Sequence, residues 1–86
     1  MTIEELLKQA INENLYRTKV ANVTSHHAYN LYDLELTNNN ITQDELNCIS
    51  EVVGDNDLQI EARGNWLYVI ANIDDEQIEE IREQNE

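Results

Sequence analysis

The chain has 86 residues, of which 18 are acidic and 5 basic, so its formal net charge at pH 7 is −13. This length allows one small domain over residues 1–86 and leaves no room for a second. Apolar residues make up 41% of the chain and recur periodically, so we expect a folded core despite the charge. Direct binding to nucleic acid is disfavoured, because phosphates repel so acidic a protein.

The sequence contains no long apolar run and no basic leader, so we expect neither a membrane span nor a secretory signal. Its single cysteine, Cys48, cannot form an internal disulfide, which fits a reducing compartment. The absence of proline and phenylalanine, together with many asparagines and isoleucines, is typical of AT-rich bacterial or phage genes. We therefore expect a cytoplasmic protein of a bacterium or of a phage-infected host cell.

The first half of the chain predicts a helix and two strands. Thr2 caps a helix over residues 3–13, in which apolar residues recur at helical spacing. Residues 15–23 are rich in β-branched side chains and predict a strand. A polar break at residues 24–27 leads to a second strand over residues 29–36, in which apolar and acidic residues alternate.

The second half predicts a helix, a hairpin and a last helix. A capping box begins a helix over residues 43–53, and Gly54 suits a left-handed end to it. The segments 58–63 and 66–73 form a hairpin around a Gly-Asn pair of the kind with glycine first. An acidic helix follows over residues 75–84.

The predicted order of elements is α, β, β, α, β, β, α. We interpret it as an α+β fold, a four-stranded sheet with the first two helices on one face and an acidic C-terminal helix appended. The apolar positions of these elements predict the core. Its expected members are Leu6, Leu7, Ile11, Leu34, Leu46, Ile49, Val53, Ile60, Leu67 and Val69.

No motif in the chain points to catalysis or to a cofactor. One candidate nucleophile is Cys48, which we interpret as a small residue at the border of the core. The other is Ser25 beside His26 or His27. These histidines are expected to be exposed in a turn, and they lack the third ligand of a zinc site. Asp55-Asn56-Asp57 resembles the start of a calcium loop, but Ile60 and Trp66 stand where such a loop requires glycine and glutamate. We therefore expect a non-enzymatic protein without metal or cofactor.

The charge is distributed in blocks along the chain. Residues 25–57 contain seven acids and no base, for a net charge of −7. Residues 74–86 contain seven acids and Arg82 alone, for a net charge of −6. Blocks of one sign produce a directional field, which favours a partner of the opposite charge.

The last helix brings like charges together. Acids at positions 75, 76, 79, 80, 83 and 86 lie three or four residues apart, and each such pair costs roughly 0.2 to 0.5 kcal/mol at low salt. Six pairs cost on the order of 1 to 3 kcal/mol, a sizeable part of a small domain's stability. One interpretation is a solvated face or a frayed acidic tail. The functional interpretation is a surface arranged for a basic partner.

The last strand leaves Trp66, Tyr68 and Ile70 on the side of the sheet opposite the first two helices. We expect the last helix to cover this strip through Ile78 and Ile81, and the alternative is an interface. In either arrangement Trp66 lies at the hairpin, a common position for a binding anchor.

These features predict a protein that binds and inhibits a basic, nucleic-acid-handling protein, such as a nuclease or another defence effector, by imitating a phosphate backbone. The residues expected to contact the partner are Asp75, Glu76, Glu79, Glu80, Glu83, Asp33, Glu35, Asp55, Asp57, Trp66 and Tyr68. In size, acidity and lack of catalytic motifs the chain resembles small phage-encoded anti-defence inhibitors: DNA-mimicking anti-restriction proteins, inhibitors of uracil-DNA glycosylase and anti-CRISPR proteins. The resemblance is one of composition and carries no motif.

The alternative function is that of a cytosolic adaptor or regulatory homodimer, which associates through the hairpin at Trp66. Salt distinguishes the two, because association through opposite charges slows as ionic strength rises and hydrophobic dimerisation does not.

Overall fold

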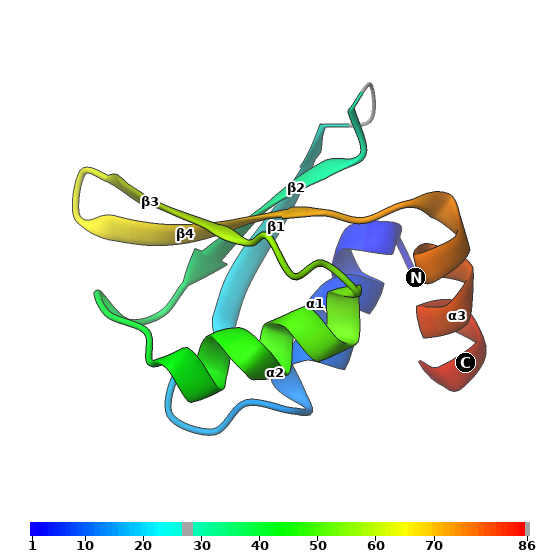
Figure 1. Ribbon diagram of the computed structural model, residues 1–86, viewed down its shortest axis with the longest axis horizontal. Helices are drawn as coiled ribbons and strands as arrows, with labels where there is room; N and C mark the ends of the chain where they lie inside the picture. Colours follow the sequence, from blue (N-terminus) through cyan, green and yellow to red (C-terminus); the bar gives the residue numbers. More distant parts are fainter. Residues whose placement is uncertain (27–28, 86) are drawn as a thin grey trace.

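Three helices and four strands follow one another in the predicted order, α, β, β, α, β, β, α (Figure 1). The computed structural model describes residues 1–26 and 29–85. Its elements are α1 (Ile3–Asn12), β1 (Val20–His26), β2 (Leu31–Leu36), α2 (Gln43–Val53), β3 (Gln59–Arg63), β4 (Trp66–Asn72) and α3 (Asp75–Asn85). The α+β class is confirmed, and the predicted bounds of the helices and of the second hairpin agree to within one residue at each end.

The strands form one antiparallel sheet in the order β1-β2-β4-β3. Its central strands, β2 and β4, place Leu34 opposite Val69 and Asp33 opposite Ile70. Because successive strand residues point to opposite faces, the first pair faces the helices and the second faces away from them. We call the side without helices the open sheet face. It carries His26, Asp33, Glu35, Glu61, Arg63, Trp66, Tyr68 and Ile70.

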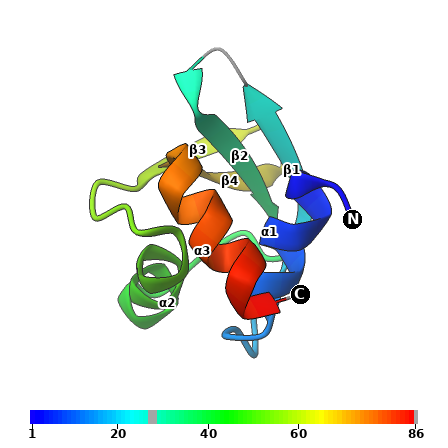
Figure 2. The ribbon, with the colours of Figure 1, turned by 90° about the vertical axis from the view of Figure 1, so that its right-hand side faces the viewer.

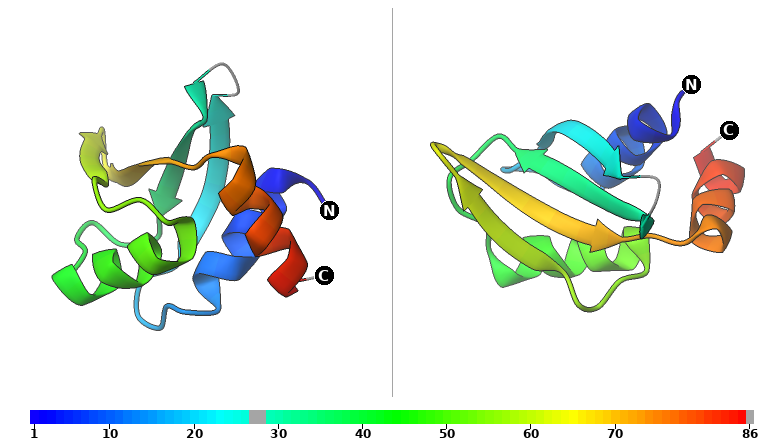
Figure 3. Two further views of the ribbon diagram at one scale, coloured as in Figure 1. Left: turned by 45° about the vertical axis from the view of Figure 1, so that its right-hand side comes forward. Right: turned by 90° about the horizontal axis from the view of Figure 1, so that it is seen from above.

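All three helices lie on one side of the sheet (Figures 1 and 3). α1 packs against β1 and α3, and α3 also contacts α2 (Figure 2). Ile78 and Ile81 of α3 are buried in the same core as Leu6 and Ile49. The expectation that the last helix covers the aromatic strip of β4 was therefore wrong, because its apolar side chains turn toward α1 on the other side of the sheet.

The core lies between the helices and the sheet. The predicted core residues are buried, except that Leu46 and Leu67 are partly buried against the core and Ile60 is 48% exposed. Ile60 lies opposite the buried Val69, yet every residue of β3 is exposed. Among the described residues, α1 packs against β1, and no helix packs closely against β3. Alternation along the strand therefore predicted the side to which Ile60 points, but its burial was wrongly predicted.

β1 begins five residues later than predicted and also ends later. The preceding segment is a loop, in which the ammonium group of Lys19 donates to the carbonyl of Asn12, the last residue of α1, and to the carbonyl of Leu15 in the turn after it. At its other end, residues predicted to be a polar break continue the strand, with Thr24 opposite Asp33. Polarity alone therefore does not end this strand, because pairing with β2 continues to His26.

Among the residues that the structure describes, three adopt left-handed backbone conformations. Gly54 (φ 71°) ends α2 and Gly64 (φ 61°) takes the first position of the loop between β3 and β4, and both were predicted. The left-handed conformation of Asn30 (φ 55°) was not predicted. Asparagine tolerates this conformation, and the carbonyl of Asn30 accepts the N–H of Ile73 at 2.9 Å. β2 therefore begins two residues later than predicted.

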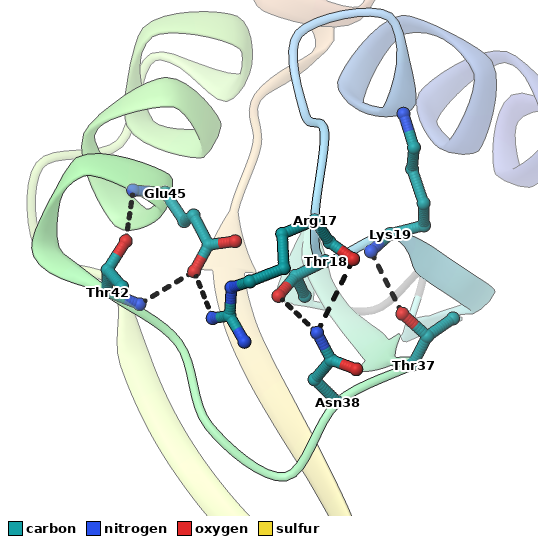
Figure 4. A network of polar contacts seen from close by, with 7 residues as sticks. All are labelled: Arg17, Thr18, Lys19, Thr37, Asn38, Thr42 and Glu45. Carbon is teal, nitrogen blue, oxygen red and sulfur yellow. Dashed lines mark hydrogen bonds and ion pairs between the residues drawn. The ribbon is translucent and has the colours of Figure 1, made fainter.

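A polar network joins the loop after α1 to the start of α2 (Figure 4). The hydroxyl of Thr42 accepts the N–H of Glu45 at 3.2 Å, and Oε1 of Glu45 accepts the N–H of Thr42 at 2.8 Å, which is the predicted capping box. The same oxygen lies 2.7 Å from Arg17. Beside them, Asn38 donates to the buried hydroxyl of Thr18 at 2.8 Å. The bond from Thr42, helped by Arg17, lowers the pKa of Glu45 from 4.5 to about 2.

Candidate protein-binding surfaces

The outer side of α3 presents acids that were predicted to bind a partner. The exposed carboxylates of α3 are Asp75, Glu76, Glu79, Glu80 and Glu83. Among the described residues, their only ion pair is a long one, 3.9 Å between Glu79 and Arg82. A frayed tail does not fit this segment, because Ile78 and Ile81 anchor it in the core. Glu86 lies outside the described residues.

Two further acids lie near these, one in α2 and one in the turn after α1. A groove of about 440 Å³ is formed by residues of α1, α2, α3 and the turn after α1. Among the described residues, its lining contains the carboxylates of Glu13, Glu51 and Glu80, four side-chain amides and no base. We call the five exposed carboxylates of α3 together with Glu13 and Glu51 the acidic helix surface. Sequence reasoning missed these last two, because only the packing of the helices brings them beside α3.

Carboxylates also gather near the start of α3. Burial raises the pKa of the Tyr32 phenol, and the nearby carboxylates of Glu4 and Asp75 raise it further. Oε1 of Glu4 accepts a hydrogen bond from the hydroxyl of Ser25 at 2.9 Å. The negative field of the acidic helix surface therefore continues from α3 to the first turn of α1.

Asp33 has two partners on the open sheet face, Arg63 and His26. Its Oδ2 atom lies 2.9 Å from the guanidinium of Arg63 and 3.2 Å from Nε2 of His26, and the residue is 6% exposed. Burial alone would raise the pKa of Asp33, but the hydrogen bonds with Arg63 and His26 outweigh it and lower the pKa. The carboxylate predicted to contact a partner thus already has two partners within the chain.

Arg63 connects several of the other side chains on this face. Its guanidinium lies 4.7 Å from the centre of the Tyr68 ring and 3.1 Å from Glu61. The hydroxyl of Tyr68 donates to Oε1 of Glu35 at 3.0 Å, which raises the pKa of Tyr68. Tyr68 and Glu35 were both predicted to contact a partner. In the structure they are hydrogen-bonded to each other, and both are half-buried.

Asp55 and Asp57 lie in the loop between α2 and β3. One carboxylate oxygen of Asp55 accepts the N–H of Asp57 at 2.9 Å, and the other accepts the N–H of Asn72 at 2.8 Å. Asp55 thereby ties the loop to the end of β4, while Asp57 is exposed. The acidic block at residues 25–57 is therefore divided among several surfaces and does not form a single one.

Trp66 stands at the end of the sheet, directly after the loop that joins β3 to β4. It is 53% exposed and borders a hollow of about 250 Å³ that Asn39, Ala62 and Leu67 also line. A large side chain left this accessible suits a contact with another molecule. That Trp66 and Tyr68 contact a partner stays a prediction.

The candidate nucleophiles have structural surroundings. Ser25 donates to a glutamate, His26 pairs with an aspartate, and Cys48 is partly buried against the core as predicted. His27 lies outside the described residues. In the part of the chain that the structure describes, no three His, Cys, Asp or Glu side chains are grouped to hold a metal ion. No helix there is long and apolar enough to cross a membrane.

Comparison of the chain with models of protein families, with curated proteins and with solved structures found no match. The function proposed below is inferred from the geometry and charge of the described residues.

Proposed function

We propose that this protein is a non-catalytic inhibitor or modulator that binds a basic, nucleic-acid-handling protein, such as a nuclease, through the acidic helix surface. The observation that carries the proposal is the exposure of five carboxylates on the outer side of one helix, with Arg82 as the only base of that helix. Glu13 and Glu51 widen this patch across the groove to the other helices. Cationic surfaces on a partner would be attracted to it over distances of about a Debye length, or roughly 8 Å at physiological salt.

The charge density along α3 supports nucleic-acid mimicry. Five carboxylates less Arg82 leave four net charges between Asp75 and Glu83, which is about 12 Å of helix at 1.5 Å per residue. The spacing is about one net charge per 3 Å. One strand of B-DNA carries a charge about every 3.4 Å along its axis. A groove that binds nucleic acid would therefore meet a comparable linear charge on α3.

The anchoring of α3 also supports this function. Like charges three or four residues apart weaken a helix, and here they are retained on a helix that Ile78 and Ile81 hold in the core. The side chain of Gln77 adds a hydrogen bond to the carbonyl of Val52 at 3.0 Å. The carboxylates are thus displayed from an anchored element, so less conformational entropy is lost when a partner binds.

The test compares two variants that lose the same charge. One is Glu76→Gln/Glu80→Gln on α3, and the control is Glu5→Gln/Asp44→Asn at exposed positions elsewhere. Each is immobilised for capture of proteins from a bacterial lysate at low and high salt. Captured proteins are then released with a duplex DNA oligonucleotide.

We expect the wild type and the control to retain a basic protein that DNA displaces, and the α3 variant to lose most of it. High salt should reproduce the loss. An equal loss in both variants would show that net charge rather than this surface directs binding. A captured protein that DNA does not displace would contradict mimicry.

A further inference from the structure

The two edges of the sheet differ in whether other groups bind their backbone and in how regular their pairing is. At the β1 edge, the side-chain amide of Asn12 binds both backbone groups of Val20, donating to its carbonyl at 3.0 Å and accepting its N–H at 2.7 Å. A shift in register between Val20 and Asn22 further interrupts this edge. Covered backbone groups and irregular pairing are devices that prevent a strand from pairing with another chain.

The β3 edge has neither device. Its five residues are all exposed, and its register with β4 is continuous from Gln59 to Arg63. Among the described residues, no side chain forms a hydrogen bond with the backbone of β3. An exposed strand of this kind is a template for a further strand.

The hairpin geometry shows which backbone groups of β3 are free. Arg63 and Trp66 flank a two-residue loop, and such flanking residues form a hydrogen-bonded pair. Hydrogen-bonded and non-hydrogen-bonded pairs alternate along an antiparallel ladder. Arg63, Glu61 and Gln59 therefore direct their backbone groups to β4, and Ile60 and Ala62 direct theirs outward.

We propose that two copies of this chain associate by antiparallel pairing of their β3 strands, with Ile60 on the two-fold axis. In this register the outward backbone groups of Ile60 bond to those of Ile60 in the second copy, and their exposed side chains meet. Gln59 lies opposite Glu61 of the second copy, so the carboxylate faces an amide. Beyond the strand, Arg63 lies toward the exposed Asp57 of the second copy, which pairs opposite charges.

The neighbouring register is disfavoured by charge. With Glu61 on the axis, the two Glu61 carboxylates would be directly opposite each other, in a non-hydrogen-bonded pair whose Cα atoms are about 4.5 Å apart. The register with Ile60 on the axis avoids this contact and pairs the edge with a second copy of this chain. It gives an eight-stranded sheet with the helices of both copies on the same side.

The effect of salt distinguishes this dimerisation from binding of a basic partner through the acidic helix surface. Each chain has a net charge of −13, so the two copies repel each other. Added salt screens this repulsion and should strengthen the dimer, whereas it should weaken binding to a basic partner. The dimer does not depend on the proposed function, and either can fail without the other.

The first experiment measures the mass of the protein by sedimentation equilibrium over a range of concentrations and salt. Ile60→Lys places two ammonium groups on the axis, and Tyr16→Lys is the matched control at a residue that is 92% exposed. We expect the wild type and the control to dimerise, more tightly at high salt, and Ile60→Lys to raise the dimer dissociation constant more than about tenfold. A monomeric wild type at high salt, or an unchanged dimer of Ile60→Lys, would overturn the proposal.

The second experiment tests the register by oxidation in a Cys48→Ser background. In the proposed register the Cα atoms at position 60 are about 5.5 Å apart, within reach of a disulfide. Ile60→Cys should therefore form a covalent dimer. Glu61→Cys should not, because its two copies are displaced along the strands. Preferential crosslinking of Glu61→Cys would overturn the register.

Discussion

The guanidinium of Arg63 lies 2.9 Å from Oδ2 of Asp33 and joins the edge strand β3 to β2 across the intervening β4. The Tyr68 ring lies against it from β4, 4.7 Å away. An ion pair thus crosses a sheet face that no helix covers. Asp33 is nearly buried, so this pair loses less to solvent screening than an ordinary surface ion pair.

Removing the cation of this pair should destabilise the fold. Arg63→Met leaves the carboxylate of Asp33 with His26 alone, and we expect the free energy of unfolding, measured by urea denaturation, to fall. In the double variant Asp33→Asn/Arg63→Met the two losses should not add, because each single change breaks the same contact. Strict additivity would show that the pair contributes no coupling energy.

The capping box of α2 should give the protein a pH-dependent stability. The pKa of Glu45 is about 2 in the folded chain, below its ordinary value of 4.5. Ionised Glu45 therefore stabilises the fold above about pH 4.5, and this contribution is lost as the pH falls toward 2. Glu45→Gln should be less stable than the wild type at pH 7 and equally stable near pH 2, in urea titrations at each pH. Glu83→Gln is the control, and a pH-independent difference for Glu45→Gln would contradict the expectation.

The attachment of α3 to the core should be measurable with a matched pair of isoleucines. Ile78 is 4% exposed and Ile60 is 48% exposed. Ile78→Ala should cost about 2 to 5 kcal/mol by leaving a cavity, and Ile60→Ala about 1 kcal/mol or less. Denaturation at low protein concentration keeps association out of the comparison. Similar losses in both variants would mean that α3 contributes little to the core.

Trp66 should matter for association and little for folding. Because Trp66 is 53% exposed, Trp66→Ala should leave the melting temperature nearly unchanged. If the side chain anchors a contact, its truncation should weaken binding to a captured partner or to a second copy by about 2 kcal/mol, or roughly thirtyfold. Tyr29→Ala, at a residue that is 73% exposed, is the control. Equal affinities of both variants would exclude Trp66 as an anchor.

The helices were predictable because their signals are local. Thr42 and Glu45 are three residues apart, and Gly54 directly follows the helix that they begin, so the whole of α2 is encoded in one short segment. The predicted bounds of β1 were wrong because they depend on residues that are distant in the chain. Ser25 is a strand residue through its pairing with Tyr32, which its own residue type does not indicate.

The same distinction applies to the candidate sites. Exposure of the α3 carboxylates follows from helical spacing, since Ile78 and Ile81 mark the opposite side. The proximity of Glu51 to Glu80 requires knowledge of how α2 and α3 pack. Asp33 was predicted to contact a partner, and its pairing with Arg63 was not foreseen because the two residues are 30 positions apart in the chain.

The β3–β4 hairpin and α3 lie at opposite ends of the molecule, along its longest extent of 32 Å (Figure 1). Pairing at one end therefore leaves the other end of each copy accessible. A dimer of this kind would be bivalent, with two anionic ends directed away from each other. Toward a partner that is itself oligomeric, or that presents two basic grooves, the second contact would form at a raised effective concentration, and avidity would exceed the affinity of one chain.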